Sequence, residues 1–235
     1  LTVGAGFTNN LTVAGGGGAD VIVLTNYTGT ANLTGGAAVD TYTLGAGTEV
    51  ISGAASADVV NVAVAANMAS TDVLVGGAGT DVINFSAAMT VTDAMFTGVG
   101  TFETITAGDV AMNMTLGAQA QEGGIVTVTL GNATNTVDAS AYTTAMTITG
   151  GTGADTITGG SGADTLVGGG GADIYKFAST GALNGTDVFA ANIVVTADKL
   201  DFTAFNSSLT FNATVVEHDG VADIDVTNKI VMVAT

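Results

Sequence analysis

The chain has 235 residues, with 21 Asp and Glu against 3 Lys and Arg, and a formal net charge of −18. It contains 35 Gly but no Pro, Cys or Trp. Without Cys, neither a disulfide scaffold nor a thiolate metal site can form. Three cations cannot neutralise a phosphate backbone, so we expect no nucleic-acid partner. The same acidity argues against binding to an anionic membrane surface.

The apolar content, 47% of the residues, argues against intrinsic disorder. No window reaches about 18 apolar residues without a polar interruption, so we expect no membrane insertion. The sequence starts at Leu1 without a basic region ahead of an apolar one, so we expect no cleavable signal within it. Val and Thr are abundant and aromatic residues are few, which favours β-structure built from small residues.

Residues 1–85 repeat a nonapeptide of the form G-G-x-G-x-D-x-U-x, where U is a large apolar residue. Intact copies span residues 15–23 and 76–84, and eroded copies that lack some glycines span residues 35–43 and 53–61. Each copy follows a short apolar stretch that predicts a strand. The aspartates of the four copies recur at intervals close to one coil of a solenoid: Asp20, Asp40, Asp58 and Asp81.

Residues 86–149 lose the nonapeptide but keep its rhythm. Alternating strands are predicted over residues 101–105, 125–128 and 146–149. Asp138 precedes Asp155 by 17 residues, which makes it a candidate to continue the same ladder of aspartates.

Residues 150–176 are three consecutive nonapeptides, GGTGADTIT, GGSGADTLV and GGGGADIYK. Three tandem copies without a gap are a specific signal. In each copy the glycines allow backbone angles that other residues avoid, so that carbonyl oxygens and the Asp carboxylate converge on one point. Calcium takes six to eight such oxygen ligands, so the pattern predicts calcium sites.

Two nonapeptides form one coil of 18 residues, so we expect Asp155 and Asp173 to stack on one edge and to share a calcium ion. Asp164 is expected on the opposite edge, together with Asp187. The turn glycines would contribute carbonyl ligands: Gly151, Gly153, Gly160, Gly162, Gly169 and Gly171. Further sites are predicted at the copies in residues 1–85, with these ligands: Asp20, Gly16, Gly18, Asp81, Gly77, Gly79 and Asp40.

These motifs resemble the RTX calcium-binding β-roll family. The resemblance implies calcium held between coils, export by type I secretion, and folding triggered by calcium outside the cell. Residues 186–189 and 198–202 are similar to the segment that caps many RTX rolls. The long stretch rich in Thr, Ala, Gly and Val before the tandem block resembles RTX-type bacterial surface-layer proteins.

We therefore predict an all-β fold, a right-handed parallel β-solenoid or β-roll with a β-rich C-terminal cap. Residues 1–149 would form a solenoid with intact and degenerate turns. Residues 150–177 would form the tandem β-roll block, and residues 178–235 the cap, which could include a secretion signal.

No catalytic motif is present, and His218, the only histidine, lacks the partners that a zinc site needs. We therefore expect no enzyme activity. The favoured function is a structural subunit of an extracellular calcium-dependent polymer, a bacterial surface layer or filament, with copies of itself and cell-surface polysaccharide as partners. The alternative is the C-terminal calcium-binding domain of a larger type I-secreted adhesin or hydrolase. An antifreeze sheet is disfavoured because no regular T-x-T ladder persists in the sequence.

Overall fold

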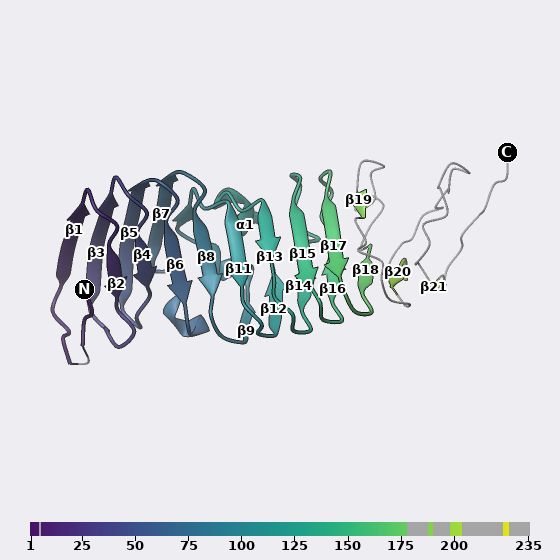
Figure 1. Cartoon of the computed structure of the whole chain (residues 1–235), viewed down its shortest axis with the longest axis horizontal. Helices are drawn as coiled ribbons and strands as arrows, with labels where there is room; N and C mark the ends of the chain where they lie inside the picture. The colour runs from purple at the N-terminus through teal and green to yellow at the C-terminus, as the bar shows by residue number, and fades with distance from the viewer. Residues whose placement is uncertain (5, 178–187, 190–197, 204–222, 226–235) are drawn as a thin grey trace.

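The computed structural model describes residues 1–4, 6–177, 188–189, 198–203 and 223–225. These residues form an all-β solenoid of parallel strands (Figure 1), which confirms the predicted fold class. Helical structure in this part of the chain is confined to three short pieces: η1 (Ala65–Asn67), η2 (Asp93–Phe96) and α1 (Ala118–Glu122).

The strands are organised in three sheets, each hydrogen-bonded in parallel. Sheet A runs almost the full length of the solenoid and contains β2 (Val21–Val23), β4 (Thr41–Thr43), β6 (Val59–Val62), β8 (Val82–Phe85), β11 (Thr104–Ala107), β13 (Thr127–Thr129), β15 (Thr147–Gly151), β17 (Thr165–Gly169) and β19 (Val188–Phe189). Sheet B contains β1 (Leu11–Gly16), β3 (Thr30–Gly36), β5 (Thr48–Ala55), β7 (Val73–Ala78) and β10 (Val99–Gly100). Sheet C contains β9 (Met89–Val91), β12 (Met112–Thr115), β14 (Thr136–Asp138), β16 (Thr156–Thr158), β18 (Ile174–Lys176), β20 (Lys199–Asp201) and β21 (Asp223–Asp225).

The partner of sheet A changes along the solenoid. In the first coils the chain alternates between sheets A and B, and in the last described coils it alternates between sheets A and C. Between them, from β8 to β13, each coil passes through sheet A, then sheet C, and then either η2 and β10 or α1. The coils in this region are therefore longer and have a third side.

The core is built from inward-facing residues that stack in register from coil to coil. Alternate residues of a strand point to opposite faces, so each short strand of sheet A contributes one central buried side chain. These side chains form one continuous rank: Ile22, Tyr42, Val60, Ile83, Ile105, Val128, Ile148 and Leu166.

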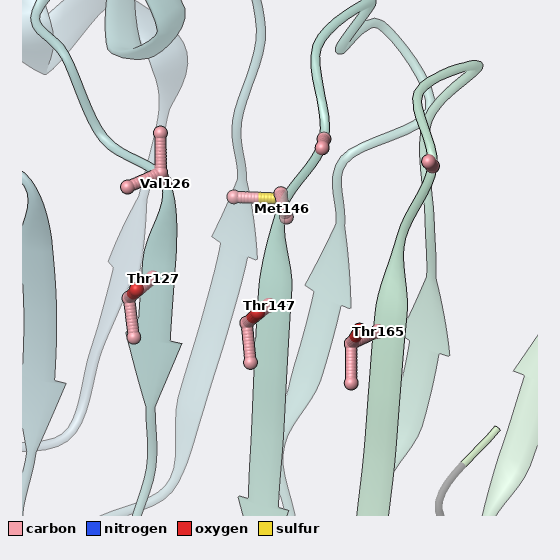
Figure 2. Close-up of a pocket in the computed structure, with 7 residues that line it drawn as sticks. Val126, Thr127, Met146, Thr147 and Thr165 are labelled. Atoms are coloured by element: carbon pink, nitrogen blue, oxygen red, sulfur yellow. The ribbon is translucent and has the colours of Figure 1, made fainter. Parts of the chain in front are cut away.

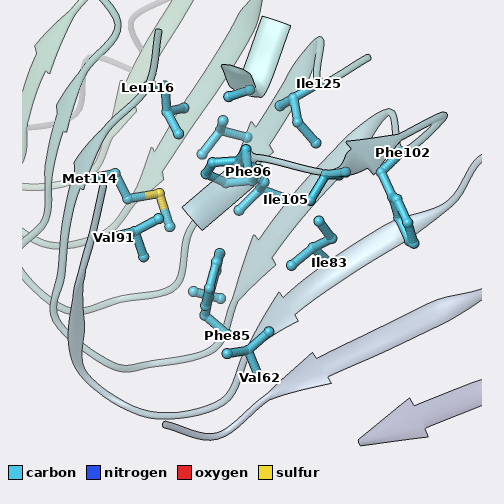
Figure 3. Packing of buried hydrophobic residues seen from close by; sticks show 14 of the residues in the cluster. Val62, Ile83, Phe85, Val91, Phe96, Phe102, Ile105, Met114, Leu116 and Ile125 are labelled. Carbon is cyan, nitrogen blue, oxygen red and sulfur yellow. The ribbon is translucent and has the colours of Figure 1, made fainter. Parts of the chain in front are cut away.

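Large apolar side chains fill the three-sided region (Figure 3). Phe85, Phe96 and Phe102 are each at most 1% exposed and lie with Ile105 and Met114 in one cluster. Aromatic side chains bury large apolar areas, so this cluster adds hydrophobic stabilisation to the three-sided region.

The predicted strands before the first four nonapeptides are present as β1, β3, β5 and β7. Sheet A crosses residue 149 without interruption, so the tandem block continues the preceding solenoid. In the predicted cap, β19 extends sheet A and β20 extends sheet C, whereas His218 and Asp187 lie outside the described residues. Within the described part of the chain, no helix is long and apolar enough to cross a membrane.

Candidate metal centre

Each coil turns sharply where it enters sheet A, and we call this line of turns the inbound edge. Strand register places one residue of each coil at equivalent positions along it, directly before a strand of sheet A. In chain order these residues are Asp20, Asp40, Asp58, Asp81, Glu103, Val126, Met146 and Asp164.

A second line of turns lies where the chain leaves sheet A and enters sheet C, and we call it the outbound edge. The equivalent residues are Met112, the first residue of β12, and four residues that each directly precede a strand of sheet C: Asn135, Asp155, Asp173 and Asp198. The structure therefore places Asp155 and Asp173 on one edge and Asp164 on the other, as the 18-residue spacing predicts.

Hydrogen bonds tie each ladder together. The main-chain N–H of Asp155 donates to Oδ1 of Asp173 at 2.8 Å, and the N–H of Asp173 donates to Oδ1 of Asp198 at 2.9 Å. The inbound edge repeats this pattern from Asp20 to Asp81, where the N–H of Asp81 donates to Glu103. From Asp40 to Asp81, and at Asp155, Asp173 and Asp198, one oxygen of each carboxylate is thus used by the fold itself.

The second oxygen of most ladder aspartates is buried without a hydrogen-bond partner. This applies to Oδ2 of Asp20, Asp40, Asp58, Asp81, Asp155 and Asp173. Burial raises the pKa of the Asp155 carboxyl, and it raises the pKa of Asp173 to about 6, with the nearby Asp198 charge adding to the effect. Buried oxygens that lack a donor are costly unless a cation or a proton meets them.

The turn backbone brings carbonyl oxygens to these carboxylates. The second residue of the nonapeptide takes a positive φ in six turns, including 112° at Gly151 and 103° at Gly169. Next to this position, a Cβ added to Gly150 would meet both Oδ2 of Asp155 and the carbonyl oxygen of Gly168 in the following coil, the latter at 2.8 Å. The carboxylate and the carbonyls therefore crowd into a space that only glycine leaves open.

This donor set fits calcium. Among the described residues no three acidic, His or Cys side chains converge. A cation at these turns would therefore be held by one carboxylate per turn and by main-chain carbonyls, all of them the hard oxygen ligands that calcium takes. Asp155 and Asp173 would hold it on the outbound edge, and Asp20, Asp40, Asp58 and Asp81 on the inbound edge.

The eroded turn at residues 53–58 keeps the backbone of the intact ones. Ala54 and Ser56 stand where glycines are expected, yet they have φ values of 80° and 78°. The loss of these glycines therefore does not remove the turn at Asp58, although it adds backbone strain.

The turn at residues 159–164 differs from its two tandem neighbours. Gly160 and Gly162 do not have positive φ, and the main-chain N–H of Gly160 donates to Oδ2 of Asp164 at 2.8 Å. Oδ1 of Asp164 accepts from the N–H of Met146 at 3.0 Å. Both oxygens of this carboxylate are used within the protein, so metal binding by Asp164, Gly160 and Gly162 stays a prediction without the support that the orphaned oxygens give elsewhere.

Asp138 does not continue the ladder of Asp155. It pairs with Thr158 inside the sheet, and its Oδ1 accepts from the N–H of Ser140. The ladder position belongs to Asn135, whose N–H donates to Oδ1 of Asp155 at 2.7 Å. The prediction for Asp138 was wrong because the coil between Asn135 and Asp155 has 20 residues instead of 18.

Three ladder residues lie outside the sequence prediction: Asn135, Asp198 and Glu103. The inbound ladder also has an apolar gap at Val126 and Met146, which line a groove of about 340 Å³ beside a row of threonines (Figure 2). Asn135 and Glu103 do not belong to a recognisable nonapeptide. The signal that could have found them is spacing, because each lies about one coil, 20 to 22 residues, from a ladder aspartate.

A family model for the RTX calcium-binding nonapeptide repeat, in four copies, matches residues 68–87 and 147–175. No curated protein and no solved structure shows significant similarity to the chain. The matched segments contain Asp81, Asp155, Asp164 and Asp173, so the family signal coincides with part of the two ladders.

Proposed function

We propose that the chain is a structural subunit of an extracellular, calcium-dependent polymer on a bacterial surface, either a surface layer or a filament. The RTX calcium-binding repeats at residues 68–87 and 147–175 support this proposal, because proteins with these repeats are generally secreted. The observation that carries this proposal is the apolar surface of the first described coil, which we call the first end. There, Phe7 is 42% exposed and lines a shallow pocket with Val3 and Leu11.

The first end also offers a strand for pairing. Among the described strands, β1 is the outermost in sheet B and pairs with β3 on one side. Strand edges favour pairing with another chain. We propose that a second copy of this chain, with the same strand spacing, pairs with the other side of β1.

The sides of the solenoid support close packing of neighbours because they carry little charge. On sheet A, Asn84 donates to Asn61 at 2.8 Å, and Thr106 donates to Asn84 at 3.0 Å. Burying such neutral, hydrogen-bonded side chains against a neighbouring molecule costs less free energy than burying ions. Bound calcium would offset part of the −18 charge that otherwise keeps copies apart.

We infer a structural rather than an enzymatic role, and export by type I secretion, from the repeat resemblance and from the absence of a catalytic motif in the sequence. The alternative is a calcium-folded domain of a larger exported adhesin or hydrolase, in which other residues cover the first end.

An antifreeze role gains some support, because T-x-T recurs in register in β11, β13 and β15. That ladder is interrupted at Asn84 and at Val167 in the flanking strands, so it does not carry the proposal.

Analytical ultracentrifugation and electron microscopy of the chain, with millimolar calcium and with EGTA, test the proposal. We expect ordered sheets or fibres with calcium and dispersed particles without it. Phe7→Asp should weaken assembly, because it places a charge on the first end. Val64→Asp, at an exposed position in the turn before η1, is the matched control and should not weaken it. A monomer at all concentrations in calcium would contradict the polymer and favour the alternative.

A further inference from the structure

Asn135 occupies a ladder position, but it differs from every aspartate described above. It is 1% exposed, and its Oδ1 accepts from the N–H of Met112 at 3.0 Å. Its main-chain N–H donates to Asp155 in the next coil. In backbone terms it is therefore a regular member of the outbound ladder.

The side-chain amide of Asn135 is directed at three main-chain carbonyl oxygens. Nδ2 lies 2.7 Å from the oxygen of Ala133, 3.3 Å from that of Gly131 and 3.2 Å from that of Gly150 in the following coil. Exchanging O and N of the amide would set an oxygen against three carbonyls and an NH2 group against the N–H of Met112. Only the orientation described satisfies all partners.

These carbonyls correspond to groups at the neighbouring turn. Aligned on the ladder, Gly131 and Ala133 match the second and fourth residues of the nonapeptide, which are Gly151 and Gly153 in the turn of Asp155. Gly150 matches Gly168. Where Asn135 has a proton-bearing nitrogen, Asp155 has Oδ2, which is buried without a donor.

We propose that the Asn135 amide takes the place of a calcium ion at the step between the coils of Asn135 and Asp155, so that residues 82–149 form a calcium-independent centre of the solenoid. The two N–H bonds of the amide supply the positive partners that a cation supplies at the aspartate turns. The steps on either side of this centre, around Asp20 to Asp81 and around Asp155 to Asp173, require calcium.

Other features of residues 82–149 agree with this division. The structure describes all of these residues, and none of their buried side-chain oxygens lacks a hydrogen-bond partner. Asp93 accepts from the N–H groups of Gly117 and Ala120 at 2.8 and 2.9 Å. On the inbound edge, Val126 and Met146 replace carboxylates altogether. The buried cluster around Phe85, Phe96 and Phe102 stabilises this centre without any metal ligand (Figure 3).

The inference rests on calcium binding by the flanking turns, which is part of the proposed function, but it does not require assembly. Asn135→Asp restores a carboxylate among the three carbonyls and should create one additional calcium site. We expect isothermal titration calorimetry with calcium chloride to give one more ion per chain than the wild type. The thermal midpoint in EGTA should fall, and calcium should restore it.

Two further variants complete the experiment. Asn135→Ala removes the amide without adding a carboxylate, so it should lower stability with and without calcium and leave the stoichiometry unchanged. Asp155→Asn is the reciprocal change and should lose one calcium ion while raising the thermal midpoint in EGTA. This reciprocal variant keeps the inference testable even if Asn135→Asp does not fold.

The outcomes separate the inference from the proposed function. A wild type that binds no calcium would refute calcium dependence as a whole. A wild type that binds calcium, together with unchanged stoichiometry and unchanged stability in EGTA for Asn135→Asp and Asp155→Asn, would overturn only the role of Asn135. Hydrogen exchange of the wild type in EGTA provides an independent readout, because amides in residues 82–149 should stay protected longer than those in residues 11–81 and 150–177.

Discussion

The main-chain N–H of Asp155 donates to Oδ1 of Asp173 at 2.8 Å, one coil further on, while Oδ2 of both residues is buried without a donor. The fold therefore uses half of each carboxylate to hold successive coils in register. The other half faces carbonyl oxygens, which repel it. A ladder of such pairs is costly unless a cation or a proton meets the second oxygens, and at neutral pH this ties folding to the supply of a cation.

Asp173→Ala should be destabilising, and more strongly in calcium than in EGTA. The substitution removes the acceptor of the Asp155 N–H, and leaving a buried donor unpaired costs about 1–3 kcal/mol. In calcium it also removes a ligand and the stabilisation that binding gives to the folded state. Thermal unfolding in both conditions measures the two effects.

Asp138→Ala is the control for that substitution. Asp138 has the same chemistry but lies within β14, off the ladder, with Oδ1 accepting only from the exposed turn at Ser140. Its effect should be small and equal with and without calcium. A calcium-dependent loss of stability in Asp138→Ala, or an equal loss in both conditions for Asp173→Ala, would argue against the ladder as the metal site.

Ala54→Gly should stabilise the protein. Ala54 has a φ of 80° in a turn position where the other five turns with positive φ have glycine, and a left-handed conformation costs a non-glycine residue about 1 kcal/mol. Because glycine also gains freedom in the unfolded chain, the net gain should be a few tenths of that value up to about 1 kcal/mol. Chemical denaturation in saturating calcium measures the change.

The converse substitution, Gly169→Ala, should destabilise strongly. Gly169 has a φ of 103°, and an added Cβ would collide with the carbonyl oxygen of Gly151 in the preceding coil. Gly170→Ala is the matched control, since a Cβ there meets only Thr152 at 3.6 Å, an ordinary contact. Equal tolerance of the two substitutions would show that the tandem turns do not have the described backbone.

The coil repeat and the strands before the nonapeptides could be predicted because they depend on local patterns. Glycine pairs fix the turns, and the apolar residue two positions after each Asp must face inward. The three-sided centre could not be predicted. Sheet C begins where β9 pairs with β12, and the paired residues are 23 positions apart in the sequence with no motif to mark them. The positive φ of Ala54 was likewise hidden, because neighbouring coils impose it against the preference of alanine.

The ladder itself was only partly predictable. Asp155 and Asp173 follow from the 18-residue coil, but Asn135 and Asp198 join them across intervals of 20 and 25 residues. Counting back from Asp155 by about one regular coil therefore gave Asp138, 17 residues earlier, which is an incorrect residue. A change of coil length shifts the register, and only the strand pairing reveals by how much.

Calcium binding should change tyrosine fluorescence through Tyr175. Its hydroxyl oxygen accepts from the N–H of Gly168 at 2.7 Å, and burial together with the nearby Asp173 charge raises its pKa to about 12. The chain has no Trp, so emission from its four Tyr residues can be read directly. A cation beside Asp173 alters the field at the phenol, and a calcium titration followed at the emission maximum should saturate with the binding curve.

Tyr175→Phe should remove much of that signal while calcium stoichiometry stays unchanged. Tyr27→Phe is the control, because the Tyr27 hydroxyl donates to the carbonyls of Asn9 and Thr30, away from the ladders. Tyr42 is the tyrosine beside the first-coil ladder, where the charges of Asp40 and Asp58 raise its pKa after the larger effect of burial. A signal that survives in Tyr175→Phe and disappears in Tyr42→Phe would mean that calcium acts at the first coils and not at the tandem block.

Glu49→Gln should stabilise the protein at pH 8 and have little effect near pH 4.5. Glu49 is fully buried, and both of its carboxylate oxygens lack a hydrogen-bond partner. Burial, and next the charge of Asp72, raise its pKa from 4.5 to about 7. In the unfolded chain the group ionises from about pH 4.5 upward, whereas in the folded protein it keeps its proton up to about pH 7. The free energy of unfolding therefore falls as the pH rises through this window, by about 3 kcal/mol in total.

Replacing Glu49 with neutral Gln removes this dependence, so the stability difference between variant and wild type should grow from pH 4.5 to pH 7 and then level off. The comparison is made in saturating calcium so that the ladder carboxylates contribute equally to both proteins. Glu122→Gln, at an exposed position in α1, is the matched control and should show no such trend. A difference for Glu49→Gln that stays flat from pH 4.5 to 8 would mean that this carboxyl is ionised and compensated in the folded protein, for example by a cation that also contacts Asp72.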